Sequence, residues 1–195
     1  MTTTAREMKR ALRAEALARR DATDPLWRAE ASLGFAEAAE EIAPAPGMVV
    51  SGFWPMRSEV DVRPLMAALA ERGARLCLPA LLDKSTMIFR ELKRGAQLVD
   101  MGFGTKGPDE TAAMLEPSLM LVPLAAFDRR GHRIGYGAGY YDRAIERLRE
   151  NGQARRLIGI AFDCQEVAEV PDEPHDVIIP EILTESGLRS FAPPL

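Results

Sequence analysis

Apolar residues recur at helical spacing in the first 43 residues of the chain. Met8, Leu12 and Ala16 fall every four residues, and neither Gly nor Pro interrupts residues 4–20, which predicts an amphipathic helix. After Asp24, a typical helix cap, a second apolar stripe predicts a second helix of about 18 residues. That stripe consists of Trp27, Ala31, Phe35, Ala38 and Ile42.

From residue 48 onward, short apolar runs alternate with helical patterns. We expect helices over residues 62–72 and 140–150, the second of them ended by Asn151 and Gly152. The runs expected to form strands are residues 48–54, 75–78, 87–92, 119–124, 156–162 and 177–179. Alternation of strands and helices favours a mainly parallel α/β sheet covered on both faces, whose ligands bind at the carboxyl ends of the strands.

Composition is that of a soluble globular protein. The chain has 195 residues, of which 47% are hydrophobic and 28% are charged, and we expect one domain over residues 1–195. The longest uncharged apolar run, residues 119–127, contains Pro123 and is shorter than the ~20 residues of a membrane span. No apolar signal-peptide core is visible, and Cys77 and Cys164 lie far apart. We therefore expect a reduced, cytoplasmic protein that contacts no membrane.

The charge is unevenly distributed although the net charge is only -4. Residues 1–28 carry seven basic and four acidic side chains, and residues 129–156 carry eight basic and three acidic ones. Two separate basic segments suggest a polyanionic ligand of modest size, whereas a nucleic-acid binder is more often basic overall. Solvated helix faces are an alternative explanation of the same pattern.

Three glycines alternate with other residues directly before the predicted helix 140–150. Gly135, Gly137 and Gly139 can adopt positive φ angles, so that successive N–H groups form an anion-binding nest at a helix N-terminus. Arg133 adds a cation, and Asp142 in the first helical turn could meet a magnesium ion that bridges phosphates. This spacing alone is as consistent with an ordinary tight turn as with phosphate binding.

The known glycine motifs do not fit this segment. No Gly-Lys-Ser/Thr follows the glycines, which excludes a P-loop. Tyr140 stands where the last glycine of a dinucleotide fingerprint would be.

Residues 133–143, Arg-Ile-Gly-Tyr-Gly-Ala-Gly-Tyr-Tyr-Asp-Arg, resemble the signature of the 5-formyltetrahydrofolate cyclo-ligase family, also called 5,10-methenyltetrahydrofolate synthetases. The resemblance covers nearly the whole chain, because weaker matches follow in the family's order. These matches are Lys9, Leu12 and Arg13; residues 54–61, Trp-Pro-Met-Arg-Ser-Glu-Val-Asp; Val122 and Pro123; residues 126–128; and residues 171–176.

The resemblance implies a three-layer α/β/α sandwich and an ATP- and Mg²⁺-dependent closure of 5-formyltetrahydrofolate to 5,10-methenyltetrahydrofolate. Lys9, Arg13 and Arg133 would reach the phosphates and act in catalysis, and Asp142 and Asp176 would serve the magnesium ion. The implied ATP-binding loop comprises Arg133, Gly135, Tyr136, Gly137, Ala138, Gly139, Tyr140 and Tyr141. Glu59, Trp54 and Tyr141 would hold the folate. The implied partners are these two small molecules and no nucleic acid, with a monomer or weak homo-oligomer expected.

Some positions differ from the family pattern. Members often carry a basic residue in the glycine loop, where this chain has Tyr136 and Ala138; Arg143 and Lys106 are candidates to supply that charge. Other departures are Leu92, Gly107 and Pro180. They motivate one alternative, a nucleotide-binding regulatory member without folate turnover. A second alternative is a sugar-phosphate isomerase or transferase that needs no ATP. His175 is expected to be structural.

Overall fold

The fold is built around one seven-stranded sheet. The computed structural model describes residues 4–83, 85–102, 104–150, 155–173 and 176–191. The α-helices are α1 (Ala5–Asp21), α2 (Pro25–Gly34), α3 (Ala38–Ile42), α4 (Arg63–Glu71) and α5 (Tyr140–Glu150). The sheet strands are β1 (Val49–Ser51), β2 (Arg75–Leu81), β3 (Met87–Glu91), β6 (Leu119–Pro123), β9 (Arg156–Ile160), β10 (Glu181–Thr184) and β11 (Gly187–Ser190).

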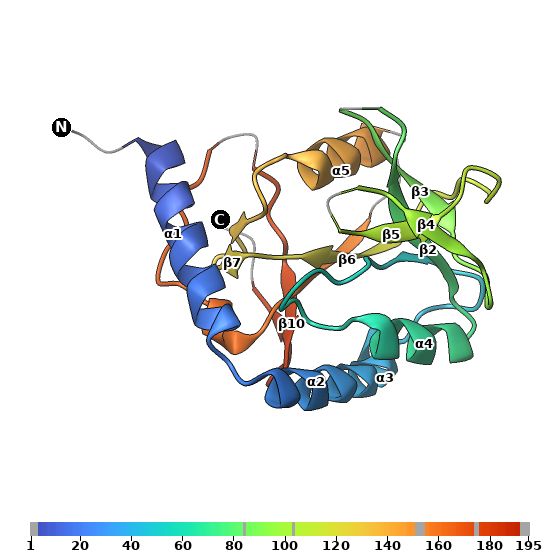
Figure 1. The fold of residues 1–195 in the computed structure, drawn as a ribbon, viewed down its shortest axis with the longest axis horizontal. Helices are drawn as coiled ribbons and strands as arrows, with labels where there is room; N and C mark the ends of the chain where they lie inside the picture. Colours follow the sequence, from blue (N-terminus) through green and yellow to red (C-terminus); the bar gives the residue numbers. More distant parts are fainter. Residues whose placement is uncertain (1–3, 84, 103, 151–154, 174–175, 192–195) are drawn as a thin grey trace.

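The sheet is mainly parallel, as predicted. Its strand order is β11-β10-β9-β6-β1-β2-β3, and only the two edge strands, β11 and β3, run antiparallel to their neighbours. Figure 1 shows α5 over one face of the sheet and α2, α3 and α4 over the other, with α1 at one side. The expected three-layer α/β/α arrangement is confirmed.

Strand β6 shows why both faces need a helical layer. Leu119 and Leu121 are buried in the core beside α3 and α4, whereas Met120 and Val122 are buried in the core beside α5. Successive side chains of a strand point to opposite faces, so an apolar residue at every position requires cover on both sides.

The N-terminal helices begin where their caps predict. Thr4 Oγ1 accepts from Glu7 N at 3.2 Å while Glu7 Oε2 accepts from Thr4 N at 2.9 Å, a capping box that starts α1. Asp24 caps α2. The single helix expected beyond Asp24 is wrong, because a 3-10 turn, Phe35–Glu37, separates α2 from α3. Gly34 weakens the helix there, and the tighter turn keeps Phe35 buried.

The strand expected over residues 48–54 is shorter than predicted. It ends at Ser51, although Gly52 N still donates to Cys77 O at 3.0 Å. Gly52 lies against α4, where a Cβ on Gly52 would come within 2.2 Å of Met66 Sδ. The chain then leaves the sheet and forms the loop that carries Trp54 and Glu59.

The strand expected over residues 177–179 is also wrong. Val177 N donates to Asp142 and Ile179 N donates to Gly131 O, so this apolar segment is buried outside the sheet. The strand that pairs with β9 is β10, which follows Pro180.

Short hairpins that the apolar pattern did not predict complete the described elements. They are β4 (Leu98–Asp100) with β5 (Lys106–Pro108), and β7 (Ala126–Phe127) with β8 (Arg133–Ile134). The predicted end of α5 at Asn151 and Gly152 lies outside the described residues.

Helix α1 lies at the carboxyl ends of the central strands. It packs against β7, which follows β6, and against the 3-10 turn Asp163–Gln165, which follows β9. Ala16 on α1 is fully buried in a small core with Ala126 and Ile134. This docking places the polar face of α1 beside the loops at the carboxyl edge, where ligands of parallel sheets bind. Within the described part of the chain, no helix is long and apolar enough to cross a bilayer.

Candidate active site

The glycine loop, residues 135–139, joins β8 to the start of α5. Gly137 and Gly139 have φ angles of +97° and +65°, which L side chains rarely adopt. Within the described part of the chain, the N–H groups of residues 136–139 donate to no protein acceptor. A run of free N–H groups before a helix N-terminus is suited to binding an anion.

A basic stripe on α1, formed by Lys9, Arg13 and Arg20, faces this loop. Intervals of four and seven residues place the three side chains along one side of the helix. Arg13 Nε donates to Gly135 O at 2.7 Å, and a Cβ added to Gly137 would lie 3.4 Å from Arg13 Nη1. The Arg13 guanidinium thus lies against the glycine loop.

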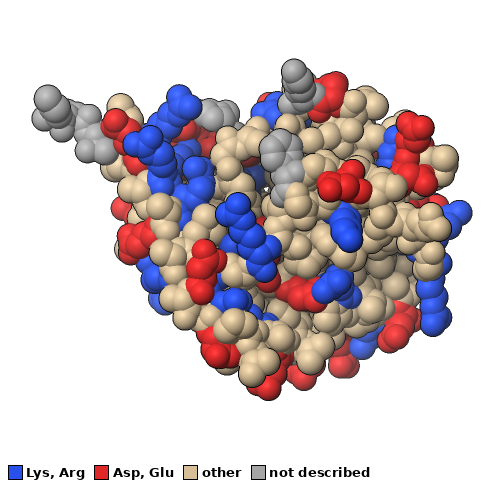
Figure 2. All heavy atoms as spheres, viewed as in Figure 1, with Lys and Arg blue, Asp and Glu red and all other residues tan. Residues whose placement is uncertain are grey.

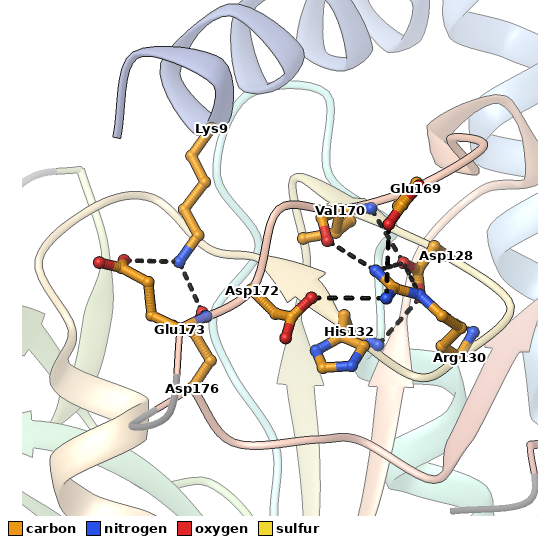
Figure 3. Close-up of polar contacts among 9 residues, drawn as sticks. All are labelled: Lys9, Asp128, Arg130, His132, Glu169, Val170, Asp172, Glu173 and Asp176. Carbon is orange, nitrogen blue, oxygen red and sulfur yellow. Dashed lines mark hydrogen bonds and ion pairs between the residues drawn. The ribbon is translucent and has the colours of Figure 1, made fainter. Parts of the chain in front are cut away.

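Lys9 joins α1 to the segment after Val170. Its Nζ donates to Glu173 Oε2 at 2.9 Å and to Asp176 Oδ2 at 2.5 Å (Figure 3). Burial by itself would lower the pKa of Lys9, but the hydrogen bonds to Asp176 and Glu173 outweigh it and raise that pKa. Lys9 therefore carries its charge beside two carboxylates.

Asp128, at the start of the β7–β8 turn, fixes the position of that segment. Its carboxylate is fully buried and accepts from Arg130 Nε at 3.0 Å, from Val170 N at 2.9 Å and from His132 N at 3.1 Å (Figure 3). Arg130 in turn donates to Val170 O at 2.7 Å. Glu173, which accepts from Lys9, lies three residues after Val170. By holding Val170, Asp128 therefore also helps to fix the segment that contacts Lys9.

Arg133 and Asp142 form an ion pair between the hairpin and the first turn of α5. Arg133 Nη2 lies 2.8 Å from Asp142 Oδ1, which also accepts from Val177 N at 3.4 Å. The second bond brings the backbone beside Asp176 to Asp142, so the two acidic residues expected to serve magnesium belong to one site.

The donor set fits a magnesium ion that is bound largely through phosphate and water. Among the described residues, no group of three or more His, Cys, Asp and Glu could hold a metal. Mg²⁺ commonly uses one or two carboxylates together with substrate phosphates and water. Asp142 and Asp176 meet that requirement, although Arg133 and Lys9 already engage them.

Glu59 lies beside the glycine loop, on the loop that leaves β1. The residue is 8% exposed, and its Oε2 accepts from Met56 N at 2.8 Å. Within the described part of the chain, Glu59 Oε1, Tyr141 Oη and Arg133 Nε are buried without a hydrogen-bond partner. Burial raises the pKa of Glu59, and burial together with the Glu59 charge raises the pKa of Tyr141. These buried polar atoms are placed to receive a ligand with its own donors and acceptors.

Cations from outside the glycine loop approach it. Arg143 lies against it, because a Cβ on Gly139 would come within 2.9 Å of Arg143 Nη1. Lys106, the other expected candidate, lies on β5, which packs against β2 and β3. The sequence did not identify Arg20 as a site residue, although its Nη1 donates to Tyr136 Oη at 2.8 Å. Arg20 lies seven residues beyond Arg13 on the same side of α1, and this spacing could have indicated that it faces the site.

The remaining expected residues lie around these groups. Trp54 is half-buried at the start of the Glu59 loop, with the Arg63 guanidinium 5.0 Å from its ring centroid. Ala138 belongs to the glycine loop, and Tyr140 is the first residue of α5. His175 lies outside the described residues.

The two basic segments of the sequence meet at this site. Figure 2 shows Lys and Arg side chains gathered over α1 and across the adjoining middle of the same face, with acidic side chains between them. Arg6 and Arg10 are exposed on α1, in addition to the stripe that faces the loop. Such a surface attracts a small anionic ligand more than neutral ones.

Together, the parallel sheet, the glycine loop at a helix N-terminus and the surrounding arginines define an α/β protein with a candidate anion-binding site. Residues 5–185 match the model of the 5-formyltetrahydrofolate cyclo-ligase family, and the chain belongs to that family of enzymes. This confirms the resemblance noted in the sequence.

Relatives and solved structures agree. The chain is 34% identical over 146 residues to the 5-formyltetrahydrofolate cyclo-ligase of Mycolicibacterium smegmatis, covering 71% of this chain and 74% of that protein. It is 29% identical over 143 residues to the Escherichia coli K12 protein of that name, covering 70% and 78%. The NMR structure of Aquifex aeolicus 5,10-methenyltetrahydrofolate synthetase matches the fold with a TM-score of 0.79, at 24% identity and over 96% and 95% of the two chains.

Replacing Glu59 by Gln should stabilise the protein increasingly as the pH rises. A raised pKa means that the folded state holds the proton more tightly, so the parent loses stability as the pH rises from about 4.5 through the folded pKa. The amide can still accept from Met56 N but carries no charge. We expect a gain of about 1 kcal/mol in unfolding free energy at pH 7 and little gain at pH 4, measured by urea unfolding. An equal gain at both pH values would contradict a buried, charged Glu59.

Replacing Asp128 by Asn should destabilise the protein by about 3 kcal/mol, because Arg130 loses its buried charged partner. The matched control is Asp172→Asn, which removes a more exposed partner of the same arginine, 3.4 Å away. We expect the control to change the unfolding free energy by less than about 0.5 kcal/mol. Similar losses in both variants, measured by urea unfolding, would show that Asp128 is no special anchor.

Proposed function

We propose that the protein converts 5-formyltetrahydrofolate to 5,10-methenyltetrahydrofolate, using ATP and Mg²⁺ and releasing ADP and phosphate. One observation carries the proposal: a run of free N–H groups surrounded by arginines lies beside a buried carboxylate with an unpartnered oxygen. The first part suits the phosphates of ATP, and the second suits the N–H donors of a pterin-like ring. Family membership supplies the reaction class. We also propose that the protein is cytoplasmic and acts without a macromolecular partner.

ATP is required in the proposed reaction because a formyl amide is a poor electrophile. Transfer of the γ-phosphoryl group to the formyl oxygen breaks the bond to ADP and turns that oxygen into a good leaving group. The neighbouring anilino nitrogen of the same folate then attacks the formyl carbon, loses its proton, and phosphate departs with the oxygen. The second step is intramolecular, so the protein has only to hold both nitrogens in ring-closing geometry.

Each group of the site has a role in this proposal. The glycine loop and Arg133 would hold the phosphates, while Lys9 and Arg13 approach from α1 and stabilise the negative charge that spreads during transfer. Asp142 and Asp176 would hold Mg²⁺, which neutralises phosphate charge when bound. Glu59 and Tyr141 would fix the folate, with Trp54 as a wall of its pocket.

The oxygen atom of the formyl group provides a direct test. If that oxygen accepts the γ-phosphoryl group, substrate labelled with ¹⁸O in the formyl group should yield labelled inorganic phosphate, one label per methenyl product. Mass spectrometry of the phosphate and the absorption band of the product measure both quantities. Labelled water with unlabelled phosphate would overturn the mechanism. Nucleotide binding without any product would favour the regulatory alternative, and turnover without ATP would favour the isomerase or transferase.

Replacing Gly137 by Val should lower ATP affinity by about tenfold or more, because a β-branched residue is strained at φ +97° and its side chain enters the nest. Gly95→Val is the control: Gly95 has a similar φ of +77°, and a Cβ there would meet nothing within 4 Å. We expect the control to retain parental ATP affinity in a titration calorimeter. ATP binding that is equally tight in Gly137→Val and the parent would show that the loop is merely a turn.

A further inference from the structure

Arg20 is a buried cation on α1 that forms no ion pair with a carboxylate of the described residues. It is 3% exposed, and its partners are hydroxyl groups on two separate loops. A buried charge is costly unless polar groups compensate it. Lysine and arginine are rarely fully buried unless their charge is paired, so the burial of Arg20 between two loops requires an explanation.

The two hydroxyl groups belong to the two halves of the candidate site. Arg20 Nη1 donates to Tyr136 Oη at 2.8 Å, in the glycine loop, and Arg20 Nε donates to Ser58 Oγ at 2.9 Å, in the loop that carries Glu59. Ser58 in turn donates to the Asp21 carboxylate. A guanidinium holds its donors in a rigid planar fork. The fork therefore fixes the position of one loop relative to the other.

The electrostatics of the Glu59 carboxylate reflect the same arrangement. Burial raises the pKa of Glu59, whereas Tyr136 and the Arg20 charge oppose that rise. The pKa of Glu59, the carboxylate proposed to bind folate, thus depends on Tyr136 of the glycine loop and on Arg20, the cation that joins the loops.

Among the described residues, the glycine loop also has N–H groups without a protein acceptor directly beside Tyr136. Tyr136 is followed by Gly137 in the left-handed region, and the residue is 40% exposed although its hydroxyl accepts from Arg20 Nη1. An anion that orders the free N–H groups of this loop would fix Tyr136 as well. Through Arg20, it would then fix Ser58 and its neighbour Glu59.

We propose that Arg20 is a positioning residue that couples nucleotide binding at the glycine loop to folate binding at Glu59. The inference rests on the proposed function, because it assigns ATP and folate to the two loops. By linkage, each ligand raises the affinity for the other by the same factor.

The coupling factor is measured by titrating 5-formyltetrahydrofolate with and without a non-hydrolysable ATP analogue. We expect the analogue to raise folate affinity by about tenfold in the parent. Ser58→Ala removes one bond of Arg20. Tyr136→Phe removes the other bond together with the direct interaction of the Tyr136 hydroxyl with Glu59. Each variant should reduce the factor to roughly threefold or less. Because both bonds belong to one connection, the double variant should lose no more coupling than either single variant.

Ser32→Ala is the matched control. Ser32 Oγ is buried and accepts from Asp61 N at 3.0 Å, so its loss loosens the same Glu59 loop without touching Arg20. We expect this variant to retain the parental coupling factor even where its folate affinity falls. Loss of coupling in the control as severe as in Ser58→Ala would mean that any disturbance of this loop has the effect, and would overturn the role of Arg20.

Hydrogen exchange gives a second readout that needs no folate. The ATP analogue alone should slow exchange at the Glu59 amide, which donates to Met56 O at 3.0 Å, in the parent and in Ser32→Ala but not in Tyr136→Phe. Unchanged exchange at that amide in the parent, or an unchanged coupling factor in Ser58→Ala, would overturn the inference. A parent that produces methenyltetrahydrofolate while its variants keep full coupling refutes only this inference, whereas a parent without turnover refutes the proposed function.

Discussion

The site depends on where three cations of one helix find hydrogen-bond acceptors. Lys9, Arg13 and Arg20 leave solvent on the same side of α1, and a desolvated cation needs an acceptor close by. Lys9 finds carboxylates more than 160 residues away, Arg13 finds a carbonyl of the glycine loop, and Arg20 finds hydroxyls of two loops. The docked position of helix α1 and the positions of these loops therefore depend on each other.

A second set of buried groups remains unsatisfied, and this shapes the balance between stability and function. Glu59 Oε1, Tyr141 Oη and Arg133 Nε are buried and find no hydrogen-bond partner among the residues that the structure describes. Each such group costs about 1–3 kcal/mol relative to a satisfied one. A ligand that supplies the missing partners recovers that free energy on binding, so the protein is less stable without its ligand than its core would allow. An arrangement of this kind selects against ligands that lack matching donors and acceptors.

Local signals in the sequence were sufficient for the layers of the fold but not for its irregular parts. Helix α5 was predicted with its observed start because Gly139 and a 3.6-residue apolar period mark it, and β6 because its apolar run is short and continuous. The run at residues 177–179 misled because burial against α5 also requires apolar residues. In the site, the glycine loop was found from its glycine spacing and from the resemblance, and Glu59 from the resemblance. Arg20 was missed, because its place on the basic stripe of α1 does not indicate its contacts 38 and 116 residues away.

The arginines around the glycine loop explain how a loop containing Tyr136 and Ala138 can still serve an anion. A basic side chain on the loop itself would move with the loop and would have to be ordered on binding. Arg13 and Arg143 stand instead on helices, and Arg13 is already fixed by Gly135 O. Charges held in place before the ligand arrives lose less conformational entropy on binding and need less reorganisation during phosphoryl transfer. In the proposed site, the small glycine loop would therefore contact the anion through its backbone, while neighbouring helices supply the charge.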